Sequence, residues 1–256
     1  PVLLAAIKMK IPTIVHEQNV FPGLTVRMVA HKADITAISF DETEKYFKRP
    51  PKRLLLTGNP IRPGILKAAK NEKDGELLVL ISGGSLGAEK LNDALIELLK
   101  KDGQDYYGII ASTGVRNYQA VMDKIKAEGI KLCRNKKIVP YIYDMDKVLA
   151  EANLAVTRSG AITVSELCAI GKPAILIPSP NVTNDHQTYN AHFMEKKGAA
   201  VVISEKDLSG DVLAVQIKTL LSDRAKLRKM SEAGRKSAIT TACEVIYEAV
   251  LELTQD

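Results

Sequence analysis

The stretch Thr157-Arg158-Ser159-Gly160-Ala161-Ile162-Thr163-Val164-Ser165-Glu166 places a glycine turn between the end of an apolar run and the start of a helical pattern. Backbone N–H groups at a helix N-terminus attract phosphate. A carboxylate further along the same helix can accept hydrogen bonds from the vicinal hydroxyls of a ribose. The stretch therefore predicts a strand, a phosphate-binding turn and a helix, as in an α/β nucleotide site.

The sequence around this stretch alternates between short apolar runs and amphipathic segments. Strands are expected at 77–82, 107–112, 137–140, 154–157, 173–177 and 200–203, and helices at 88–101, 117–128, 145–151, 162–170, 185–197 and 208–222. Such alternation with short loops predicts a parallel β-sheet that helices cover on both faces.

A smaller region of the same kind precedes the turn formers at 58–64, which predict a domain junction. We expect strands at 12–16, 35–39 and 54–57 there, with helices at 2–9, 22–30 and 43–47. The region is short beside the roughly 100 residues of a doubly wound domain, so it resembles the C-terminal half of one. The predicted domains are a partial N-terminal domain at 1–62, a complete C-terminal domain at 63–236 and a returning segment at 237–256, with 224–254 helical throughout.

Composition sets broad limits on function. The 256 residues are 46% hydrophobic, enough for a buried core, and the net charge of +6 favours anionic partners without choosing among them. The three cysteines lack metal-binding spacing, so we expect free thiols in the reducing cytoplasm, no metal and no cofactor. We see no apolar run long enough to cross a bilayer, and a start at Pro1 instead of methionine indicates missing upstream residues.

A second glycine loop, Ser82-Gly83-Gly84-Ser85-Leu86-Gly87-Ala88, follows another predicted strand. Its glycines let the backbone approach an anion, and Ser85 adds a hydroxyl donor. Such a loop is also a common tight connection, and its spacing is neither a Walker A motif nor a dinucleotide fingerprint. Because Ser159-Gly160-Ala161 ends another strand of the same domain, we expect both turns to meet in one crevice.

Several polar side chains near these turns are candidates for binding a sugar nucleotide. Arg158 supplies a cation and Glu166 a ribose acceptor, although an acid near a helix start also complements the helix dipole and Arg158 could be a surface residue. Gln187 and Asn190 are three residues apart, so both amides project from one helix face toward sugar hydroxyls. The alternative for this segment is an N-cap at Asp185 followed by solvated residues.

The turn His16-Glu17-Gln18-Asn19 ends a predicted strand of the smaller region. His16 or Glu17 could accept a proton from an attacking hydroxyl, although structural turns use such residues more often. Arg62, at the junction, can reach a cleft from either side. The basic and aromatic run at 45–53 could rest on an anionic membrane, although such runs are usually just solvated.

Taken in order, the motifs of this chain closely resemble those of the MurG family of UDP-N-acetylglucosamine transferases, in glycosyltransferase family 28. The motifs are His16-Glu17-Gln18-Asn19 with Pro22-Gly23, Thr57-Gly58-Asn59-Pro60-Ile61-Arg62, Gly83-Gly84-Ser85-Leu86-Gly87-Ala88, Tyr141-Ile142-Tyr143-Asp144-Met145, 157–166 and 185–190. Several are loose alone, but six in register are too many for coincidence.

The resemblance implies a GT-B fold, in which two Rossmann-like domains face a cleft. It implies inverting, metal-independent transfer of N-acetylglucosamine from UDP-N-acetylglucosamine to lipid I, which forms lipid II for peptidoglycan at the cytoplasmic face of the bacterial inner membrane. The expected partners are this donor, lipid I and the anionic membrane surface, and no nucleic acid. Ser85 would contact the diphosphate, the backbone of Ile142 the uracil, Glu166 the ribose and Gln187 the N-acetylglucosamine. Asn19, Arg62 and the turn of Ala161, Ile162, Thr163, Val164 and Ser165 would complete the donor site.

One feature of the family has no counterpart in this sequence. A glycine-rich loop with a histidine, the usual candidate for the catalytic region, would precede Pro1, so we expect donor binding without full activity in this chain. The alternatives are another GT-B enzyme, such as a diacylglycerol glycosyltransferase or a UDP-N-acetylglucosamine 2-epimerase, and a non-catalytic donor-binding subunit. The turn at His16 with Pro22-Gly23 argues against the first, and the short N-terminal region favours the second.

Overall fold

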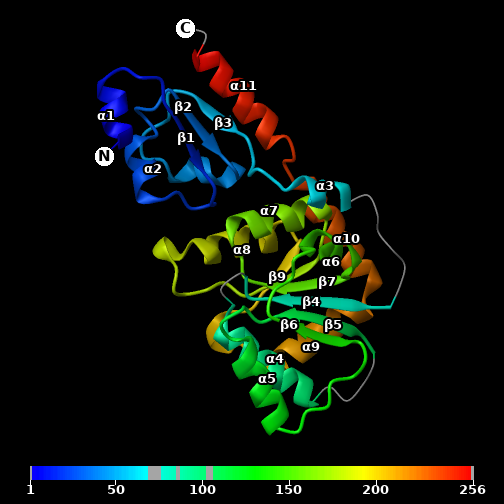
Figure 1. The fold of residues 1–256 in the computed structure, drawn as a ribbon. Helices are drawn as coiled ribbons and strands as arrows, with labels where there is room; N and C mark the ends of the chain where they lie inside the picture. Colours follow the sequence, from blue (N-terminus) through cyan, green and yellow to red (C-terminus); the bar gives the residue numbers. More distant parts are fainter. Residues whose placement is uncertain (1, 69–75, 85–86, 102–105, 255–256) are drawn as a thin grey trace.

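The computed structural model describes residues 2–68, 76–84, 87–101 and 106–254. These residues form two α/β units, each built on a parallel sheet, with the smaller unit above the larger one in Figure 1. The helices α7 and α8 lie between the two sheets in that view.

The larger sheet has the strand order β6-β5-β4-β7-β8-β9, and every neighbouring pair is parallel. Its strands are β4 (Leu78–Ser82), β5 (Gly108–Ser112), β6 (Lys136–Val139), β7 (Leu154–Thr157), β8 (Ala174–Leu176) and β9 (Ala200–Val202). The chain adds strands on one side of β4 and then, from β7 on, adds them on the other side. The order therefore reverses between β4 and β7, and open α/β sheets bind ligands outside the strand ends at such a point.

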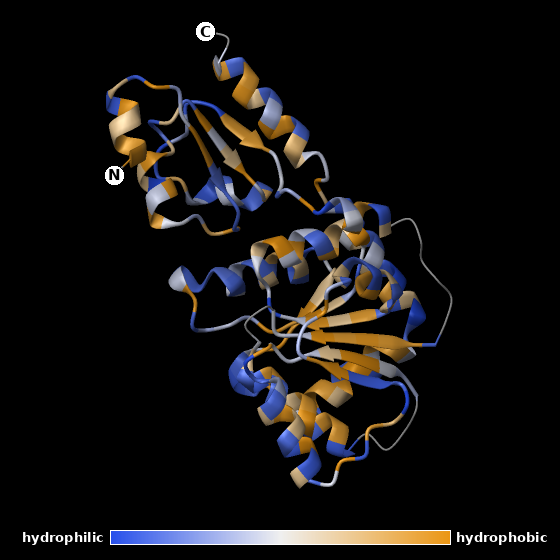
Figure 2. Cartoon of the chain, viewed as in Figure 1, coloured by the Kyte–Doolittle hydropathy of each residue, from blue (hydrophilic) through white to orange (hydrophobic). Residues whose placement is uncertain are grey.

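Helices cover both faces of this sheet, as the alternating pattern predicts. On one face lie α4 (Glu89–Lys101), α5 (Tyr118–Ala127) and α9 (Gly210–Ser222), and on the other α6 (Met145–Glu151), α7 (Ala161–Ile170) and α8 (His186–Lys196). Two apolar cores result, one on each face, and the strands between them are the most uniformly apolar part of Figure 2. A parallel sheet buried on both faces needs such strands.

The smaller sheet has the order β1-β2-β3, also parallel. Its elements are α1 (Val2–Lys8), β1 (Ile14–Glu17), α2 (Leu24–Val29), β2 (Ile35–Ile38), the 3₁₀ helix η1 (Asp41–Tyr46) and β3 (Leu54–Leu56). Far along the sequence, α11 (Ala242–Thr254) lies beside β3, where Arg53 and Glu252 form an ion pair of 2.5 Å. The chain end therefore lies against the smaller unit.

The predicted α/β fold is confirmed, but two helix predictions are wrong. The segment 224–254 is interrupted, because α10 (Arg224–Lys236) ends before α11 begins at Ala242. The break lets the chain leave the larger unit and turn toward the smaller sheet, and Ile239 within it packs against Gly58. The junction also contains a helix that the turn-rich sequence concealed, α3 (Pro63–Ala68). Pro63 is favourable at a first helical position, because the N–H that proline lacks has no partner there.

Gly58 is the residue at which the break between α10 and α11 touches the domain junction. Its φ is +76°, and an added Cβ would lie 2.7 Å from the Cβ of Ile239. Gly129 has a similar φ of +66° with no atom within 4 Å of an added Cβ. Both glycines therefore adopt the left-handed backbone conformation, but only Gly58 lacks space for a side chain.

We expect Gly58→Ala to lower the free energy of unfolding by about 2–4 kcal/mol, through left-handed strain plus steric overlap. Gly129→Ala, the matched control, should cost about 1–2 kcal/mol, because only the strain applies. Urea denaturation of the two variants measures the difference. Equal losses would show that contact with Ile239 does not constrain the junction.

Candidate functional site

The two glycine turns meet where the order of the larger sheet reverses. Ser82 at the end of β4 pairs in register with Thr157 at the end of β7. A cavity of about 120 Å³ opens there, and Ser82, Gly84, Thr157, Thr163 and Glu166 are among its lining residues. The crevice expected from the sequence therefore exists.

The first turn is built for close approach of backbone to a ligand. A Cβ on Gly83 would lie 2.6 Å from the backbone nitrogen of Ala88, whereas Gly84, with a φ of +85°, faces open space. Only glycine satisfies both positions without strain. Ser85, the residue expected at a diphosphate, lies outside the described residues.

The second turn leads directly into α7. Gly160 is the N-cap of that helix. Because glycine has no side chain, it provides no side-chain cap for the first N–H groups of α7. Of the predicted turn residues, Thr163 lines the cavity, Ala161 and Val164 are buried, and Ile162 is partly exposed. The helix end therefore offers N–H donors toward the crevice.

Glu166 and Arg62, both predicted for the donor site, contact each other across the crevice. Arg62 donates two hydrogen bonds to the Glu166 carboxylate, Nε to Oε1 at 2.6 Å and Nη2 to Oε2 at 2.9 Å. Glu166 raises the pKa of Arg62, chiefly through this hydrogen bonding. The Glu166 side chain is 7% exposed and that of Arg62 54%, so solvent reaches the cation and screens the pair. A buried carboxylate needs hydrogen-bonding partners, and a ribose diol could replace Arg62 in part.

Asn190, predicted to bind sugar, instead joins the two units. Its side chain is fully buried; Oδ1 accepts from the Val20 N–H at 3.0 Å, and Nδ2 donates to Asn19 Oδ1 at 3.0 Å and to the Ser159 carbonyl at 3.1 Å. Both N–H groups of the carboxamide and one lone pair of its oxygen are thus engaged. The geometry supports a structural role for Asn190.

The neighbouring predicted residues also make internal contacts. Ser159 is fully buried and donates its hydroxyl to the Gln187 carbonyl at 2.7 Å. The Gln187 side chain accepts from the Ser179 N–H at 2.9 Å through Oε1, which leaves its amide NH₂ for a ligand. Arg158 is not a surface residue: it donates to the Ile177 carbonyl at 3.1 Å and pairs with Glu205. Arg158 thus braces the strand ends of the larger sheet.

The turn after β1 lies against this group from the smaller unit. Glu17 is buried, and its carboxylate accepts from the N–H groups of Asn19 at 2.9 Å and Gly23 at 2.8 Å, so it closes the turn. His16 is half-buried, and burial lowers its pKa below the usual value, against the raising effects of the Gly58 carbonyl and Glu17. At neutral pH the imidazole is therefore uncharged. Of the two predicted proton acceptors, Glu17 closes the turn, whereas no such contact from the described residues holds Nδ1 of His16.

The loop expected at the uracil carries Ile142, whose side chain is buried in the core beside α7. Tyr141 and Tyr143 on either side are exposed. The buried side chain anchors the loop, which leaves the backbone of residue 142 as the part that can contact a base.

Two further residues reach this region that the sequence analysis did not single out for it. Met145, at the start of α6, lines the cavity. Asn59 is buried and contacts both units, bonding Ser165 of α7 at 3.0 Å and the Gln18 carbonyl at 2.9 Å. Its place in a turn-rich junction concealed it, since asparagine is common in turns for local reasons.

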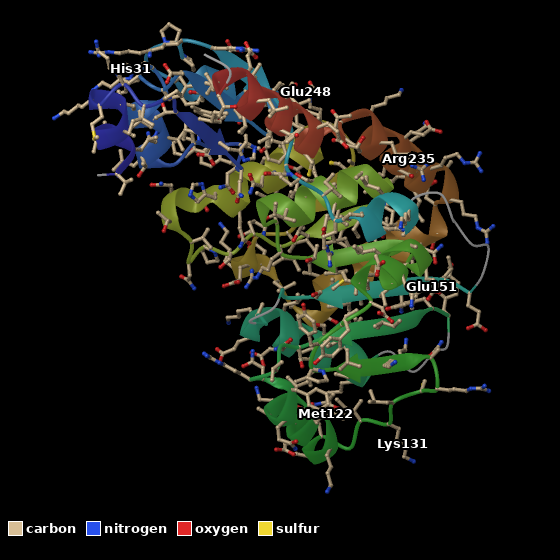
Figure 3. The ribbon with its side chains drawn as sticks, turned by 45° about the horizontal axis from the view of Figure 1, so that its top comes forward. His31, Met122, Lys131, Glu151, Arg235 and Glu248 are labelled. Atoms are coloured by element: carbon tan, nitrogen blue, oxygen red, sulfur yellow. The ribbon has the colours of Figure 1, made fainter. Side chains whose placement is uncertain are left out.

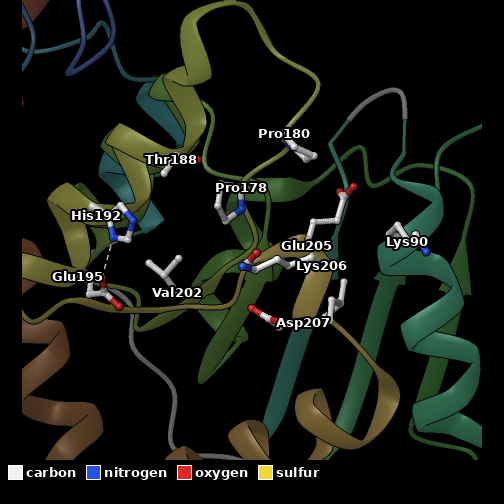
Figure 4. Close-up of a pocket in the computed structure, with 12 residues that line it drawn as sticks. Lys90, Pro178, Pro180, Thr188, His192, Glu195, Val202, Glu205, Lys206 and Asp207 are labelled. Atoms are coloured by element: carbon white, nitrogen blue, oxygen red, sulfur yellow. Dashed lines mark hydrogen bonds and ion pairs between the residues drawn. The ribbon is translucent and has the colours of Figure 1, made fainter.

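A separate hollow of about 590 Å³ lies beyond the ends of β8 and β9 (Figure 4). Thr188, His192 and Glu195, spaced along one face of α8, line it, and a hydrogen-bonded ion pair joins the last two at 2.8 Å. Asn190, in contrast, faces the smaller unit. The hollow is thus separated by α8 from the contacts between the units.

The described residues contain neither a metal-binding cluster nor a membrane-spanning helix. No cluster of three or more histidine, cysteine or acidic side chains suited to a metal was found among them. Within the same residues, no helix combines the length and apolar character that a membrane span requires.

Comparison with known proteins identifies the family. The model of the glycosyltransferase family 28 C-terminal domain matches residues 78–245, and that of the family's N-terminal domain matches residues 1–38. The chain belongs to glycosyltransferase family 28. The fold is therefore GT-B, as expected from the sequence.

Two curated members of the family align along nearly the whole chain. Both are named UDP-N-acetylglucosamine--N-acetylmuramyl-(pentapeptide) pyrophosphoryl-undecaprenol N-acetylglucosamine transferase. The protein of Caldanaerobacter subterraneus is 45% identical over 99% of this chain and 71% of its own length. The protein of Acetivibrio thermocellus is 46% identical over 100% of this chain and 70% of its own length.

Solved structures agree on the fold. MurG of Acinetobacter baumannii superposes with a TM-score of 0.80 and 30% identity, covering 97% of this chain and 69% of that one. A putative UDP-N-acetylglucosamine 2-epimerase of Listeria monocytogenes has a TM-score of 0.69 at 15% identity, covering 96% of this chain and 69% of that one. The second likeness shows a shared fold alone.

We expect Asn190→Ala to lower the free energy of unfolding by about 2–4 kcal/mol, because it leaves the Val20 N–H and the Ser159 carbonyl buried without a partner. Asn181→Ala, at an exposed position of the preceding loop, is the control and should change stability by less than about 0.5 kcal/mol. Urea denaturation checks both. A neutral Asn190→Ala would mean that water or a neighbouring group replaces the carboxamide.

Proposed function

We propose that this chain transfers N-acetylglucosamine from UDP-N-acetylglucosamine to lipid I, forming lipid II. The observation that carries the proposal is the crevice at the reversal point, where two glycine turns and the start of α7 lie beside the buried Glu166. The named activity of relatives about 45% identical along the whole chain supports the same substrates. The division into domains at 1–62, 63–236 and 237–256 remains part of this proposal.

The proposed roles follow the geometry of the crevice. UDP would lie with its diphosphate at Gly83, Gly84 and the N-terminus of α7, and its ribose diol at Glu166, which would displace part of the Arg62 contact. Gln187 would donate its free NH₂ to the N-acetylglucosamine. Positive helix-end charge then offsets the negative charge that develops on leaving UDP.

The chemical step would be an inverting displacement that needs no metal. The acceptor hydroxyl attacks the anomeric carbon, the bond to the UDP oxygen breaks, and the proton of the hydroxyl passes to a base. Neutral His16, near the end of β1 in the smaller unit, is suited to accept that proton, whereas Glu17 is occupied by the turn.

We expect Glu166→Ala to weaken binding of UDP by about 10- to 100-fold, because ribose loses a charged hydrogen-bond acceptor. Glu248→Ala is the control, since Glu248 is an exposed acid on α11, away from the crevice (Figure 3). Isothermal titration calorimetry with UDP and UDP-N-acetylglucosamine measures both variants. If the unsubstituted chain gives no heat of binding at millimolar nucleotide, the proposed donor site is wrong.

Transfer of labelled sugar to a lipid I analogue tests the rest of the proposal. Donor binding without transfer would favour the donor-binding subunit, the alternative that the sequence left open. Transfer by this chain alone would establish the full reaction.

We also propose that the protein associates peripherally with the anionic cytoplasmic face of the inner membrane through the basic run at 45–53. Lys45, Lys52 and Arg53 in this run have acidic partners in Glu42, Asp34 and Glu252, whereas Lys48 and Arg49 are exposed. Charges that are not neutralised by neighbours attract acidic headgroups most strongly.

Reversing both exposed charges, with Lys48→Glu and Arg49→Glu, should weaken binding to phosphatidylglycerol vesicles by at least about tenfold, because each basic residue near a membrane contributes about 1 kcal/mol to the binding free energy. Co-sedimentation with the vesicles measures this binding. Lys131→Glu, at the far end of the larger unit in Figure 3, is the control for a single charge reversal outside the run. Unchanged sedimentation of the double variant would remove this surface from the proposal.

A further inference from the structure

The junction residue Asn59 is bonded to both sides of the proposed active site. Its carboxamide is 1% exposed, and its Nδ2 donates to the Gln18 carbonyl at 2.9 Å and to Ser165 Oγ at 3.0 Å. Gln18 belongs to the turn after β1, whereas Ser165 belongs to α7 and precedes Glu166. One side chain thus touches the turn that directly follows the strand of His16 and the helix that carries the ribose acceptor.

The other end of the carboxamide points toward His16. Asn59 Oδ1 accepts from Ser39 Oγ at 2.9 Å, and the same hydroxyl oxygen lies 3.1 Å from His16 Nε2. The orientation of the amide is fixed by chemistry, because the Gln18 carbonyl can only accept and must therefore face the NH₂ group. Asn59 and His16 are separated by a single hydroxyl.

The same contacts determine which nitrogen of His16 carries the proton. His16 Nε2 lies 3.1 Å from the Gly58 carbonyl oxygen, which has no proton to give. Ser39 Oγ directs its one proton toward the Glu17 carbonyl, at 2.8 Å, or toward Asn59 Oδ1. A neutral His16 therefore bears hydrogen on Nε2, and Nδ1 keeps the lone pair that can take a proton.

We propose that Asn59 is a positioning residue, which orients the Ser39 hydroxyl beside His16 Nε2 and places the turn that follows β1 against α7. The inference rests on the proposed function for its catalytic meaning, but the arrangement itself can be tested on the resting protein. Removal of the carboxamide takes away one of the two acceptors of the Ser39 hydroxyl, which then donates to the Glu17 carbonyl alone, while the Gly58 carbonyl keeps His16 in its Nε2–H form. It also removes the amide group that donates to both the Gln18 carbonyl and Ser165 Oγ.

The test is ¹⁵N NMR of the histidine rings in the labelled chain, in which protonated and unprotonated ring nitrogens give distinct shifts. The chain has 4 histidines, so a His16→Gln variant assigns the signals. We expect the Nε2–H form alone in the unsubstituted protein at neutral pH, and a shifted Nε2 signal with the same tautomer in Asn59→Ala. An Nδ1–H form in the unsubstituted protein, or an unchanged His16 spectrum in Asn59→Ala, overturns the proposal.

Asn92→Ala is the matched control. Asn92 is also buried and donates to a backbone carbonyl, that of Thr113 at 3.1 Å, but it lies on α4 within the larger unit. Its loss should lower the urea midpoint comparably and leave the His16 spectrum unchanged. A spectrum altered equally in Asn92→Ala would mean that general destabilisation, and not positioning, produces the effect.

Ser39→Ala provides a second variant if Asn59→Ala does not fold. It removes the hydroxyl between Asn59 and His16 while the Gly58 contact stays, so the Nε2 shift should move and the tautomer should be kept. An unmoved Nε2 shift would show that Asn59 has no route to His16 and would overturn the proposal.

UDP titration separates this inference from the proposed function. If the unsubstituted chain binds UDP and Asn59→Ala leaves His16 unchanged, the inference alone fails. If His16 responds as expected but UDP does not bind, the proposed function fails. In the transfer reaction, Asn59→Ala should lower kcat on the order of 100-fold, because the variant misplaces a reacting group.

Discussion

The contacts between the two units depend on buried asparagine carboxamides. Asn190 reaches from α8 to Val20 and Asn19, and Asn59 reaches from the junction to Ser165. An apolar interface tolerates sliding, because its attraction has no direction, whereas a buried amide loses most of its stabilisation when a partner moves away. These carboxamides therefore define one relative position of the turns on which the proposed chemistry depends.

Aromatic and charged contacts extend the same interface outward. Phe21 stacks on Tyr189 with ring centroids 4.6 Å apart, and Phe40 meets Phe193 at 4.8 Å. At the rim, Lys196 and Lys197 of the larger unit pair with Glu42 and Asp41 of the smaller one. The exposed ion pairs contribute little each. Burial of apolar area provides the attraction between the two units, and the hydrogen bonds of the carboxamides fix their relative position.

The crevice combines a rigid part with a replaceable part. Gly83 and Gly160 follow strands of the larger sheet, at the place where the diphosphate is proposed to bind. Arg62 is a half-exposed side chain on the carboxylate expected to bind ribose, and a ligand can displace it at modest cost. Such a partner keeps a buried carboxylate paired until the donor arrives.

The sequence by itself determined the local features. Glycine turns between apolar runs and amphipathic helices predict where strands end and helices begin, because those preferences act over a few residues. The α/β fold and the meeting of the turns at Ser82 and Thr157 follow from that pattern, whereas the interruption between α10 and α11 does not. The break lets the chain cross from the larger unit to the smaller one, and it depends on contacts between residues that are far apart in the sequence.

Tertiary structure alone decided what each polar side chain contacts. Asn190, Glu17 and Arg158 were plausible ligand groups by type and spacing, and each is engaged by atoms of the protein. Asn59 looked like a turn residue, yet its bond to Ser165 spans 106 positions of sequence. A hydrogen bond requires a distance and a direction that only the packed fold supplies. The sequence thus showed which residue types can bind a ligand or take part in the reaction. Only the fold showed which of these side chains are already engaged by other atoms of the protein.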